Sequence, residues 1–321
     1  MRAVVYSQYG SPDVLRYEDI AKPSAKEDEV LIEIRAASVN PLDWHFMRGT
    51  PYLVRIVTGL RKPKFSGLGV DVAGQVQAVG AKVTLFKVGD DVFGACRGAF
   101  AEYVCTSETT LVKKPANRTF EQAAAAPIAA FTALQSFRKG KLHAGQKVLV
   151  NGAAGGVGTF AVQIAKSYGA DVTGVCSSRN LDMVRSIGAD SVMDYTLEDF
   201  TKTGQGYDLI LDMVGNHTLM ALRRALKPNG ICVMSGGPTG RWKMGLARGV
   251  RAQALSLFGS RKLIGCLARA NRDDLAVMQG LLESGKVTPV IDRRYGLSEV
   301  PQAIRYLEEG HARGKIVVTL G

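Results

Sequence analysis

A cluster of glycines follows a short apolar segment, and glycines at this spacing are typical of a phosphate-binding turn. The segment Val148–Val150 is apolar and rich in valine, and a helix-like pattern covers 157–168. Glycines between them let the backbone turn tightly and approach a pyrophosphate, and the N-terminus of the helix attracts an anion. The predicted dinucleotide-binding residues are Gly152, Gly155, Gly156, Val157 and Gly158. A tight turn without a ligand is the alternative explanation.

The residues after the next β-rich segment indicate which dinucleotide is bound. A site that prefers NADH usually has Asp or Glu there, about 20 residues into the motif, to bind the ribose hydroxyls. This chain has Ser177, Ser178 and Arg179 instead, and Asp171 stands at the opposite end of that segment. Hydroxyl groups and a guanidinium suit a 2′-phosphate. We therefore expect NADPH, with a solvated Arg179 at a helix start as the alternative.

The elements that must position these residues alternate from about residue 120 onward, which predicts a doubly wound parallel sheet. The β-rich segments are 147–150, 172–175, 191–193, 207–212 and 230–235. Ligands of open α/β sheets bind at the carboxyl ends of the strands. Residues that follow two of these strands are therefore predicted to bind the cofactor: Val214, Gly215, Ser235, Gly236 and Gly237.

The first 117 residues have a different pattern, in which short β-rich runs are separated by Gly, Pro and charged residues. This pattern predicts an all-β region. Near the end, helices over 273–286 and 300–314 precede a closing strand at 315–320. The expected domains are therefore a β-rich domain beginning at 1–119, a dinucleotide-binding domain at 120–266, and a return to the first domain at 267–321.

Composition restricts the class of protein. The 321 residues are enough for two domains, and no apolar run reaches the roughly 20 residues needed to span a bilayer. The strand-like amino terminus does not resemble a secretory signal, and the five cysteines stand singly. This spacing favours a reducing cytosol over disulfides or a structural zinc. We expect a cytoplasmic protein.

The net charge of +12 is concentrated in one segment, whose basic residues are interleaved with apolar ones. Its basic residues are Arg241, Lys243, Arg248, Arg251, Arg261 and Lys262. A solvated or cofactor-facing surface is the first interpretation, and contact with an anionic membrane is the second. Nucleic acid ranks third, because the chain contains no recognisable nucleic-acid module.

Several segments together resemble the medium-chain dehydrogenase/reductase superfamily, and specifically its zinc-independent, quinone-oxidoreductase-like branch. The segments are 36–49, 69–94, 98–104, 129–134, 151–172, 207–215 and 314–318. This resemblance covers essentially the whole chain. It implies a GroES-like β-rich catalytic domain, a Rossmann domain with a doubly wound parallel sheet, and a cofactor held in the cleft between them.

The same resemblance implies that no catalytic zinc is bound. Alcohol dehydrogenases of the superfamily bind zinc through Cys, through His followed by Glu, and through a further Cys. The corresponding positions here are Asn40, Val70-Asp71 and a position near Ile128, and only Cys96 stands near the missing structural zinc lobe. Zinc needs three or four nitrogen, sulfur or carboxylate ligands. The implied reaction is metal-free hydride transfer from NADPH to a quinone or an activated alkene.

The resemblance also assigns residues near the cofactor, each with a structural alternative. Asn40 is similar to an asparagine beside the nicotinamide, although an Asn before proline also favours a β-turn. Thr132 resembles a threonine near the cofactor, and a helical Thr can instead bond its own backbone. Tyr195 resembles a tyrosine that closes over the 2′-phosphate, with a surface aromatic as the alternative. For Lys315, a solvated side chain ranks ahead of cofactor contact.

The candidate proton donors are Asp43, His45 and Tyr52, with water as a further source. Asp43 occupies a family-typical position, where it often serves as a structural hydrogen-bond acceptor. His45 has a suitable ordinary pKa but falls near a position that is aromatic in some relatives.

The leading functional hypothesis is an NADPH-dependent enone or quinone reductase with a small electrophilic substrate. A redox sensor or scaffold with little turnover and a zinc-independent alcohol dehydrogenase are the alternatives. The run at 262–268 falls where relatives place the edge strand of the Rossmann sheet, and an apolar edge strand favours pairing. We therefore expect a homodimer, with Leu263, Gly265 and Leu267 near its two-fold axis.

Overall fold

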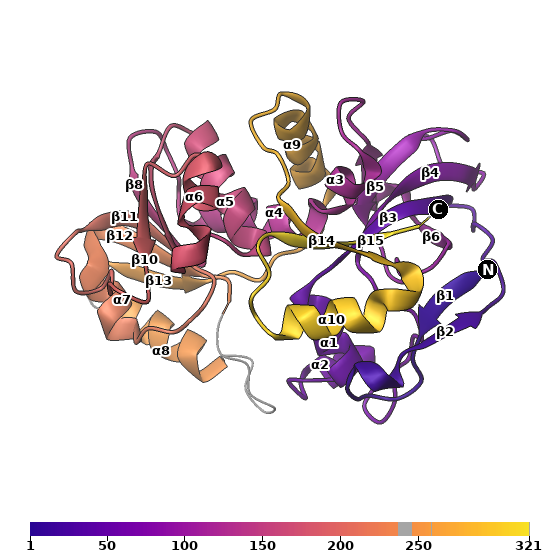
Figure 1. Cartoon of the computed structure of the whole chain (residues 1–321), viewed down its shortest axis with the longest axis horizontal. Helices are drawn as coiled ribbons and strands as arrows, with labels where there is room; N and C mark the ends of the chain where they lie inside the picture. The colour runs from indigo at the N-terminus through magenta and orange to yellow at the C-terminus, as the bar shows by residue number, and fades with distance from the viewer. Residues whose placement is uncertain (237–245, 258, 321) are drawn as a thin grey trace. The chain divides into compact units, whose positions relative to one another are not determined.

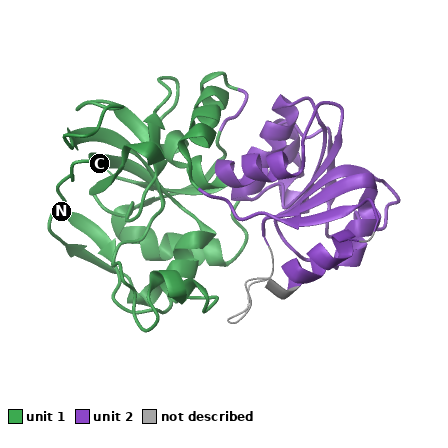
Figure 2. Cartoon of the chain, turned by 180° about the vertical axis from the view of Figure 1, so that it is seen from behind, with its two compact units in different colours: residues 1–129, 270–285, 289–321 green, residues 130–269, 286–288 purple. Residues whose placement is uncertain are grey.

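The computed structural model describes residues 1–236, 246–257 and 259–320, and the chain divides into two compact units (Figure 2). Unit 1 consists of residues 1–129, 270–285 and 289–321, and unit 2 consists of residues 130–269 and 286–288. The domain boundaries expected from the sequence, after 119 and after 266, stay a prediction. No helix among the described residues is both long enough and apolar enough to cross a membrane.

Unit 1 is built around a mainly antiparallel sheet with the strand order β14-β15-β3-β4-β5-β7, and β6 also pairs with β3 (Figure 1). The strands are β3 (Glu29–Val39), β4 (Asp71–Val79), β5 (Asp91–Ala95), β6 (Tyr103–Ser107), β7 (Leu111–Lys113), β14 (Ile291–Gly296) and β15 (Lys315–Thr319). A separate hairpin-like pair is formed by β1 (Arg2–Val5) and β2 (Arg16–Asp19). Alternate residues of β3, such as Val30, Ile32 and Ile34, are buried in the core of this unit.

Helices also occur in the first 117 residues, so the expectation of an all-β region was wrong there. Helix α1 (Pro41–Arg48) begins directly after β3, and α2 (Val54–Thr58) follows it. Pro41 stands in the first turn, and the Asp43 carboxylate accepts a hydrogen bond from the Asn40 backbone N–H at 2.7 Å. Proline and a reciprocal acidic residue at these positions favour a helix start. These local signals were present within a region that otherwise reads as strands.

The remaining helical elements of unit 1 cover its sheet and connect its segments. They are α3 (Phe120–Ala124), α9 (Arg272–Glu283), α10 (Val300–Glu308) and the short 3₁₀ turns Pro12–Val14, Glu108–Thr110 and Leu297–Glu299. Helix α10 contributes Val300, Ala303 and Ile304 to the core, which matches the helical spacing of its apolar residues.

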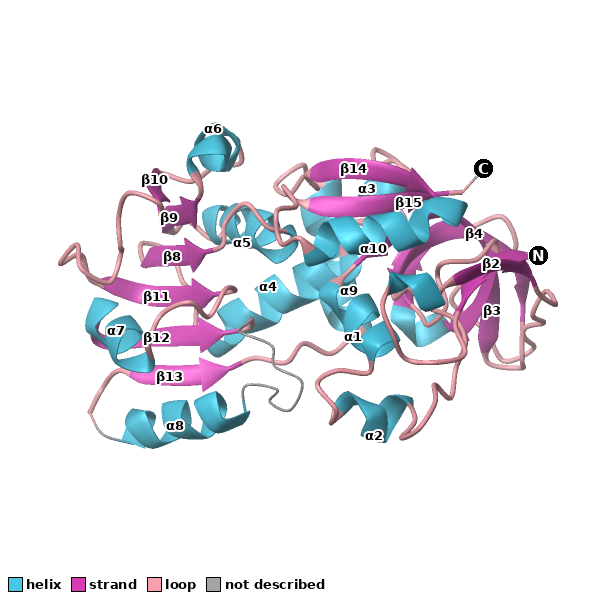
Figure 3. Ribbon diagram, turned by 60° about the horizontal axis from the view of Figure 1, so that its bottom comes forward, coloured by secondary structure: helices cyan, strands magenta, loops and turns pink. Residues whose placement is uncertain are grey.

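Unit 2 contains a parallel sheet with the strand order β10-β9-β8-β11-β12-β13 (Figure 3). Its strands are β8 (Lys147–Asn151), β9 (Asp171–Cys176), β10 (Ser191–Asp194), β11 (Tyr207–Asp212), β12 (Leu226–Met234) and β13 (Lys262–Gly265). Its helices are α5 (Gly156–Ser167), α6 (Leu181–Ser186), α7 (Leu219–Ala225) and α8 (Leu246–Leu257), and α4 (Pro127–Lys139) continues into it from unit 1. This order is that of a Rossmann sheet. The predicted doubly wound parallel sheet is confirmed.

The strand positions in this sheet follow the sequence pattern, because its central strands are buried on both faces and read as nearly continuous apolar runs. Val148, Leu149 and Val150 of β8 are all fully buried. Two bounds differ from expectation: β12 begins at Leu226 rather than near 230, and β13 ends at Gly265 rather than 268. The strand order reverses between β8 and β11, so their carboxyl ends mark the place where such sheets bind ligands.

Candidate functional site

Four buried polar side chains meet in unit 1 where β3 ends and where β4 and β15 begin. We call Ser38, Asn40, Asp71 and Lys315 the Asn40 cluster. Strand pairing explains their proximity, because Ser38 is opposite both Asp71 of β4 and Val317 of β15. The four side chains are therefore brought together by the register of the sheet, although they are far apart in the sequence.

The Asn40 cluster is held by hydrogen bonds and one buried ion pair. The Lys315 ammonium donates to Asn40 Oδ1 at 2.6 Å, and its Nζ lies 3.3 Å from Asp71 Oδ2. The same carboxylate oxygen accepts from Asn40 Nδ2 at 2.8 Å and from Ser38 Oγ at 2.6 Å. Both ends of the Asn40 amide are thus engaged, which fixes its orientation. A buried charge pair with this many partners is well compensated.

Lys315 is not the solvated lysine that ranked first from the sequence, because its residue is only 3% exposed. Asn40 is not in a β-turn either, since it precedes α1. The positions that hold zinc in the metal-dependent enzymes are joined here, because the Ile128 backbone N–H donates to Asp71 Oδ1 at 3.0 Å. The resulting donor set is one amide, one carboxylate and a cation, and an ammonium repels a metal dication. Among the described residues there is no group of three or more His, Cys, Asp or Glu that could hold a metal.

Helix α1 carries two of the candidate proton donors. Burial raises the pKa of Asp43 to about 7, and its Oδ1 has no hydrogen-bond partner while Oδ2 accepts from the Asn40 backbone. Burial lowers the pKa of His45, whose Nδ1 donates to the Thr50 carbonyl at 2.6 Å. A neutral His45 in this tautomer has only a lone pair on Nε2 and cannot donate a proton from it. Tyr52 is partly exposed, and its ring lies 4.8 Å from the Arg55 guanidinium.

The glycine turn of unit 2 connects β8 with α5, as its sequence predicts. Gly152 has a φ of +90°, and the Gly155 N–H donates to the Gly152 carbonyl at 3.1 Å. A Cβ at Gly158 would lie 2.1 Å from the Gly152 oxygen, so that position admits only glycine. A Cβ at Gly155 would meet no atom closer than 3.4 Å. The fold does not itself require glycine at 155, and this leaves room for a ligand to approach the backbone at the start of α5.

The region after β9 contains a carboxylate that sequence reasoning missed. Asp194, the last residue of β10, accepts hydrogen bonds from the Ser178 hydroxyl and from Thr196 Oγ1, the latter at 2.8 Å. These hydrogen bonds lower the pKa of Asp194. Arg179 and the 55%-exposed Tyr195 lie in the same loops. The signal for Asp194 was its place at the carboxyl end of a strand next to β9, and its negative charge opposes a bound 2′-phosphate.

A second hydrogen-bonded group lies where the strand order reverses. Asn151 Nδ2 donates to Asp212 Oδ1 and to Asn216 Oδ1, both at 2.9 Å. The same Asp212 oxygen accepts from the Gly215 N–H at 2.9 Å, which fixes the loop that contains Val214. The sequence identified the loop but missed the buried Asp212 that orders it.

The other predicted residues of unit 2 lie on separate elements. Thr132 is on α4, and the Ser235 N–H donates to the Asp212 carbonyl at 3.0 Å. A Cβ at Gly236 would lie 1.9 Å from the Met213 oxygen. Gly237 lies outside the described residues, as do Arg241 and Lys243 of the basic segment. Within α8, Arg248 donates to the His217 carbonyl at 2.8 Å and faces Asp212 at 3.6 Å, so it is an internal residue and not a free surface charge.

Comparisons with known proteins agree with this architecture. Residues 26–116 match the alcohol dehydrogenase GroES-like domain, and residues 187–318 match the zinc-binding dehydrogenase family. A 2-methylene-furan-3-one reductase of Solanum lycopersicum is 35% identical over 99% of this chain and 79% of its own length. An NADPH-dependent alkenal/one oxidoreductase of Arabidopsis thaliana, a chloroplastic protein, is also 35% identical over the same shares.

Solved structures extend the comparison to the arrangement of the chain. The quinone oxidoreductase of Coxiella burnetii has a TM-score of 0.89 with 30% sequence identity, and the match covers 100% of this chain and 99% of that one. The GroES-like region and the Rossmann sheet predicted from the sequence are both confirmed. The chain therefore belongs to the medium-chain dehydrogenase/reductase superfamily and, within it, to the quinone-oxidoreductase-like branch.

Proposed function

We propose that this protein is an NADPH-dependent reductase that delivers hydride to an enone or a quinone without a metal. The observation that carries the proposal is the Asn40 cluster, in which the Lys315 ammonium lies among the positions that bind zinc in the metal-dependent enzymes. The names of the Solanum and Arabidopsis relatives describe reductions of conjugated carbonyl compounds, which supports this substrate class.

The residues of the chain fit a dinucleotide without further assumptions. The backbone N–H groups at Gly155–Gly158 would bind the pyrophosphate, and the hydroxyls of Ser177 and Ser178 with Arg179 would bind the 2′-phosphate. A bound nicotinamide cofactor supplies the hydride. Asn40 is the proposed orienting residue, because its amide is already fixed by Lys315 and Asp71.

The proton that completes the reduction comes from water in this proposal. Hydride addition to the β-carbon of an enone leaves an enolate, which takes one proton at the α-carbon. His45 is a poor donor because burial lowers its pKa and its Nδ1 proton is held by the Thr50 carbonyl. Asp43 is buried and accepts from the Asn40 backbone, so we assign it the role of fixing the start of α1.

The test is substrate-dependent oxidation of NADPH, measured at micromolar protein with a panel of enones and quinones after exhaustive chelation. We expect turnover to survive chelation, elemental analysis to find no stoichiometric zinc, and NADH to be used less well. Reduction of NADP⁺ by alcohols that is restored by zinc would instead identify an alcohol dehydrogenase. Tight NADPH binding without turnover of any substrate would favour a redox sensor or scaffold.

We also propose that the protein is a cytoplasmic homodimer that pairs through β13. This strand is the last in the order of the parallel sheet, and beyond it the Leu267 side chain is 73% exposed, whereas Leu263 packs inward. Sedimentation should show a dimer, and Ile264→Pro should convert it to a monomer because proline blocks edge pairing. A wild-type monomer at all concentrations would contradict the proposal.

A further inference from the structure

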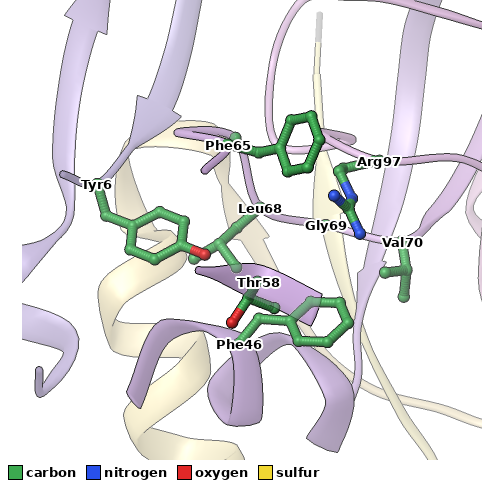
Figure 4. A pocket seen from close by; sticks show the side chains of 9 residues that line it. Tyr6, Phe46, Thr58, Phe65, Leu68, Gly69, Val70 and Arg97 are labelled. Atoms are coloured by element: carbon green, nitrogen blue, oxygen red, sulfur yellow. The ribbon is translucent and has the colours of Figure 1, made fainter. Parts of the chain in front are cut away.

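Unit 1 contains a pocket that adjoins the Asn40 cluster but does not include it. Phe46 of α1 and Val70, the residue before Asp71, connect the two sites. Figure 4 shows the side chains that surround the pocket. They are Tyr6, Phe46, Thr58, Phe65, Leu68, Val70 and Arg97, together with the backbone of Gly67 and Gly69.

The backbone around the pocket is held in a defined position by hydrogen bonds. The Tyr6 N–H donates to the Ser66 carbonyl, the Phe100 N–H to the Leu68 carbonyl and the Cys96 N–H to the Val70 carbonyl, each at 2.9 Å. Gly69 has a φ of +95°, and a Cβ there would lie 2.8 Å from the Phe100 nitrogen. Glycine at 69 therefore permits the close approach that places Val70 and Arg97 beside the same pocket.

Arg97 brings a positive charge to this pocket. Its guanidinium lies 4.2 Å from the centroid of the Phe65 ring and 5.9 Å from that of Phe46. No carboxylate among the described residues forms an ion pair with Arg97. Stacking on aromatic faces leaves the N–H groups at the edge of a guanidinium available, and these match the two oxygens of a carboxylate.

Tyr6 presents a hydroxyl from the other side of the pocket (Figure 4). Burial raises the pKa of Tyr6 to about 12, so this hydroxyl stays protonated at physiological pH and can donate a hydrogen bond. The Thr58 hydroxyl is engaged elsewhere, because it contacts the Tyr9 hydroxyl at 2.8 Å and the Val54 carbonyl at 3.1 Å. Tyr6 and Arg97 are thus the polar groups of the pocket that a ligand can use.

We propose that this pocket is a substrate subsite for conjugated carbonyl compounds that carry a carboxylate. Arg97 pairs with the carboxylate, Tyr6 donates to a carbonyl oxygen, and Phe46 and Phe65 contact the conjugated plane. The inference rests on the proposed reductase function, because it names the substrate class of that reaction. It predicts that charge, and not only electrophilicity, decides which enones are reduced.

The experiment compares 4-oxopent-2-enoate with its methyl ester, two enones that differ in the negative charge. In the Arg97→Gln variant we expect kcat/KM for the acid to fall about tenfold or more, and kcat/KM for the ester to change by less than about twofold. Arg97→Lys should retain part of the preference. The matched control is Arg293→Gln, which removes a guanidinium 3.8 Å from the Tyr306 ring in the same unit but not in the pocket.

Equal changes in kcat/KM for acid and ester in Arg97→Gln would overturn the subsite while leaving the reductase function intact. If neither compound is reduced by the wild-type protein, the reductase proposal fails for this substrate class, and the subsite is tested by binding alone. Calorimetry with 4-oxopentanoate and its methyl ester then decides: a preference for the anion that Arg97→Gln abolishes supports the subsite. Affinities that do not depend on Arg97 reject it.

Discussion

In unit 2 the glycine turn presents backbone N–H groups at the start of α5, whereas in unit 1 the Asn40 cluster consists of side chains that are paired with one another. The turn depends on residues within one short stretch of sequence, and its geometry follows from the absence of side chains. The cluster depends on β3, β4 and β15, whose register brings four residues together. A backbone site should therefore be sensitive to added atoms, and a side-chain cluster to removed partners.

The largest effect should come from removing the cation of the Asn40 cluster. Lys315→Met leaves the buried Asp71 carboxylate without its counter-charge, which we expect to cost about 3–5 kcal/mol of unfolding free energy. Urea unfolding measures this loss. The double variant Lys315→Met/Asp71→Asn should recover a substantial part of it, because no unpaired charge remains. An equally unstable double variant would show that packing, not charge, dominates the cluster.

Adding a methyl group to the glycine turn should have a smaller but position-specific effect. In Gly158→Ala the new Cβ collides with the Gly152 oxygen, and overpacking of this kind costs about 1–3 kcal/mol. Gly155→Ala is the matched control for stability, because its Cβ meets only ordinary contacts. We expect Gly155→Ala to fold normally and yet to bind NADPH more weakly in a fluorescence titration. Unchanged NADPH affinity in Gly155→Ala would remove the turn from the proposed binding site.

The loops after β9 and β10 should determine the choice of cofactor. Arg179→Ala should weaken NADPH binding by about 1.5–3 kcal/mol, the range for a charged hydrogen bond, and leave NADH binding nearly unchanged. Asp194→Asn should act in the opposite direction, because it removes a negative charge beside Ser178. Titrations of both dinucleotides against both variants provide the measurement. Equal losses for NADPH and NADH would show that Arg179 does not recognise the 2′-phosphate.

The smallest expected effect concerns Asp43 and pH. Its folded-state pKa of about 7 lies above the value of an unfolded aspartate, so the folded protein binds the proton more tightly. This contribution to stability is complete below about pH 4 and is lost as the pH rises through 7, with an expected size on the order of 1–2 kcal/mol. The slope should be absent in Asp43→Asn when unfolding midpoints are measured across this range. An identical slope in both proteins would assign it to other groups.

Local patterns predicted much of the architecture. The strands of unit 2 could be located because buried parallel strands read as apolar runs, and the glycine turn because only glycine tolerates its backbone contacts. Helix α1 was missed within an apparently all-β region, although Pro41 and Asp43 carried a start signal. Asp194 and Asp212 were missed because their partners, Ser178 and Asn151, are distant in sequence.

The sequence by itself determined that the chain contains a parallel Rossmann sheet with a glycine turn between β8 and α5. It also determined which superfamily the chain resembles, because these features depend on residues that are neighbours along the chain. Only the tertiary structure decided that Lys315 is buried against Asp71 and Asn40, and that Arg97 faces Phe46 and Phe65 beside a pocket. A side chain's partners depend on strand register and loop closure across tens to hundreds of residues, and a single sequence does not display those distances.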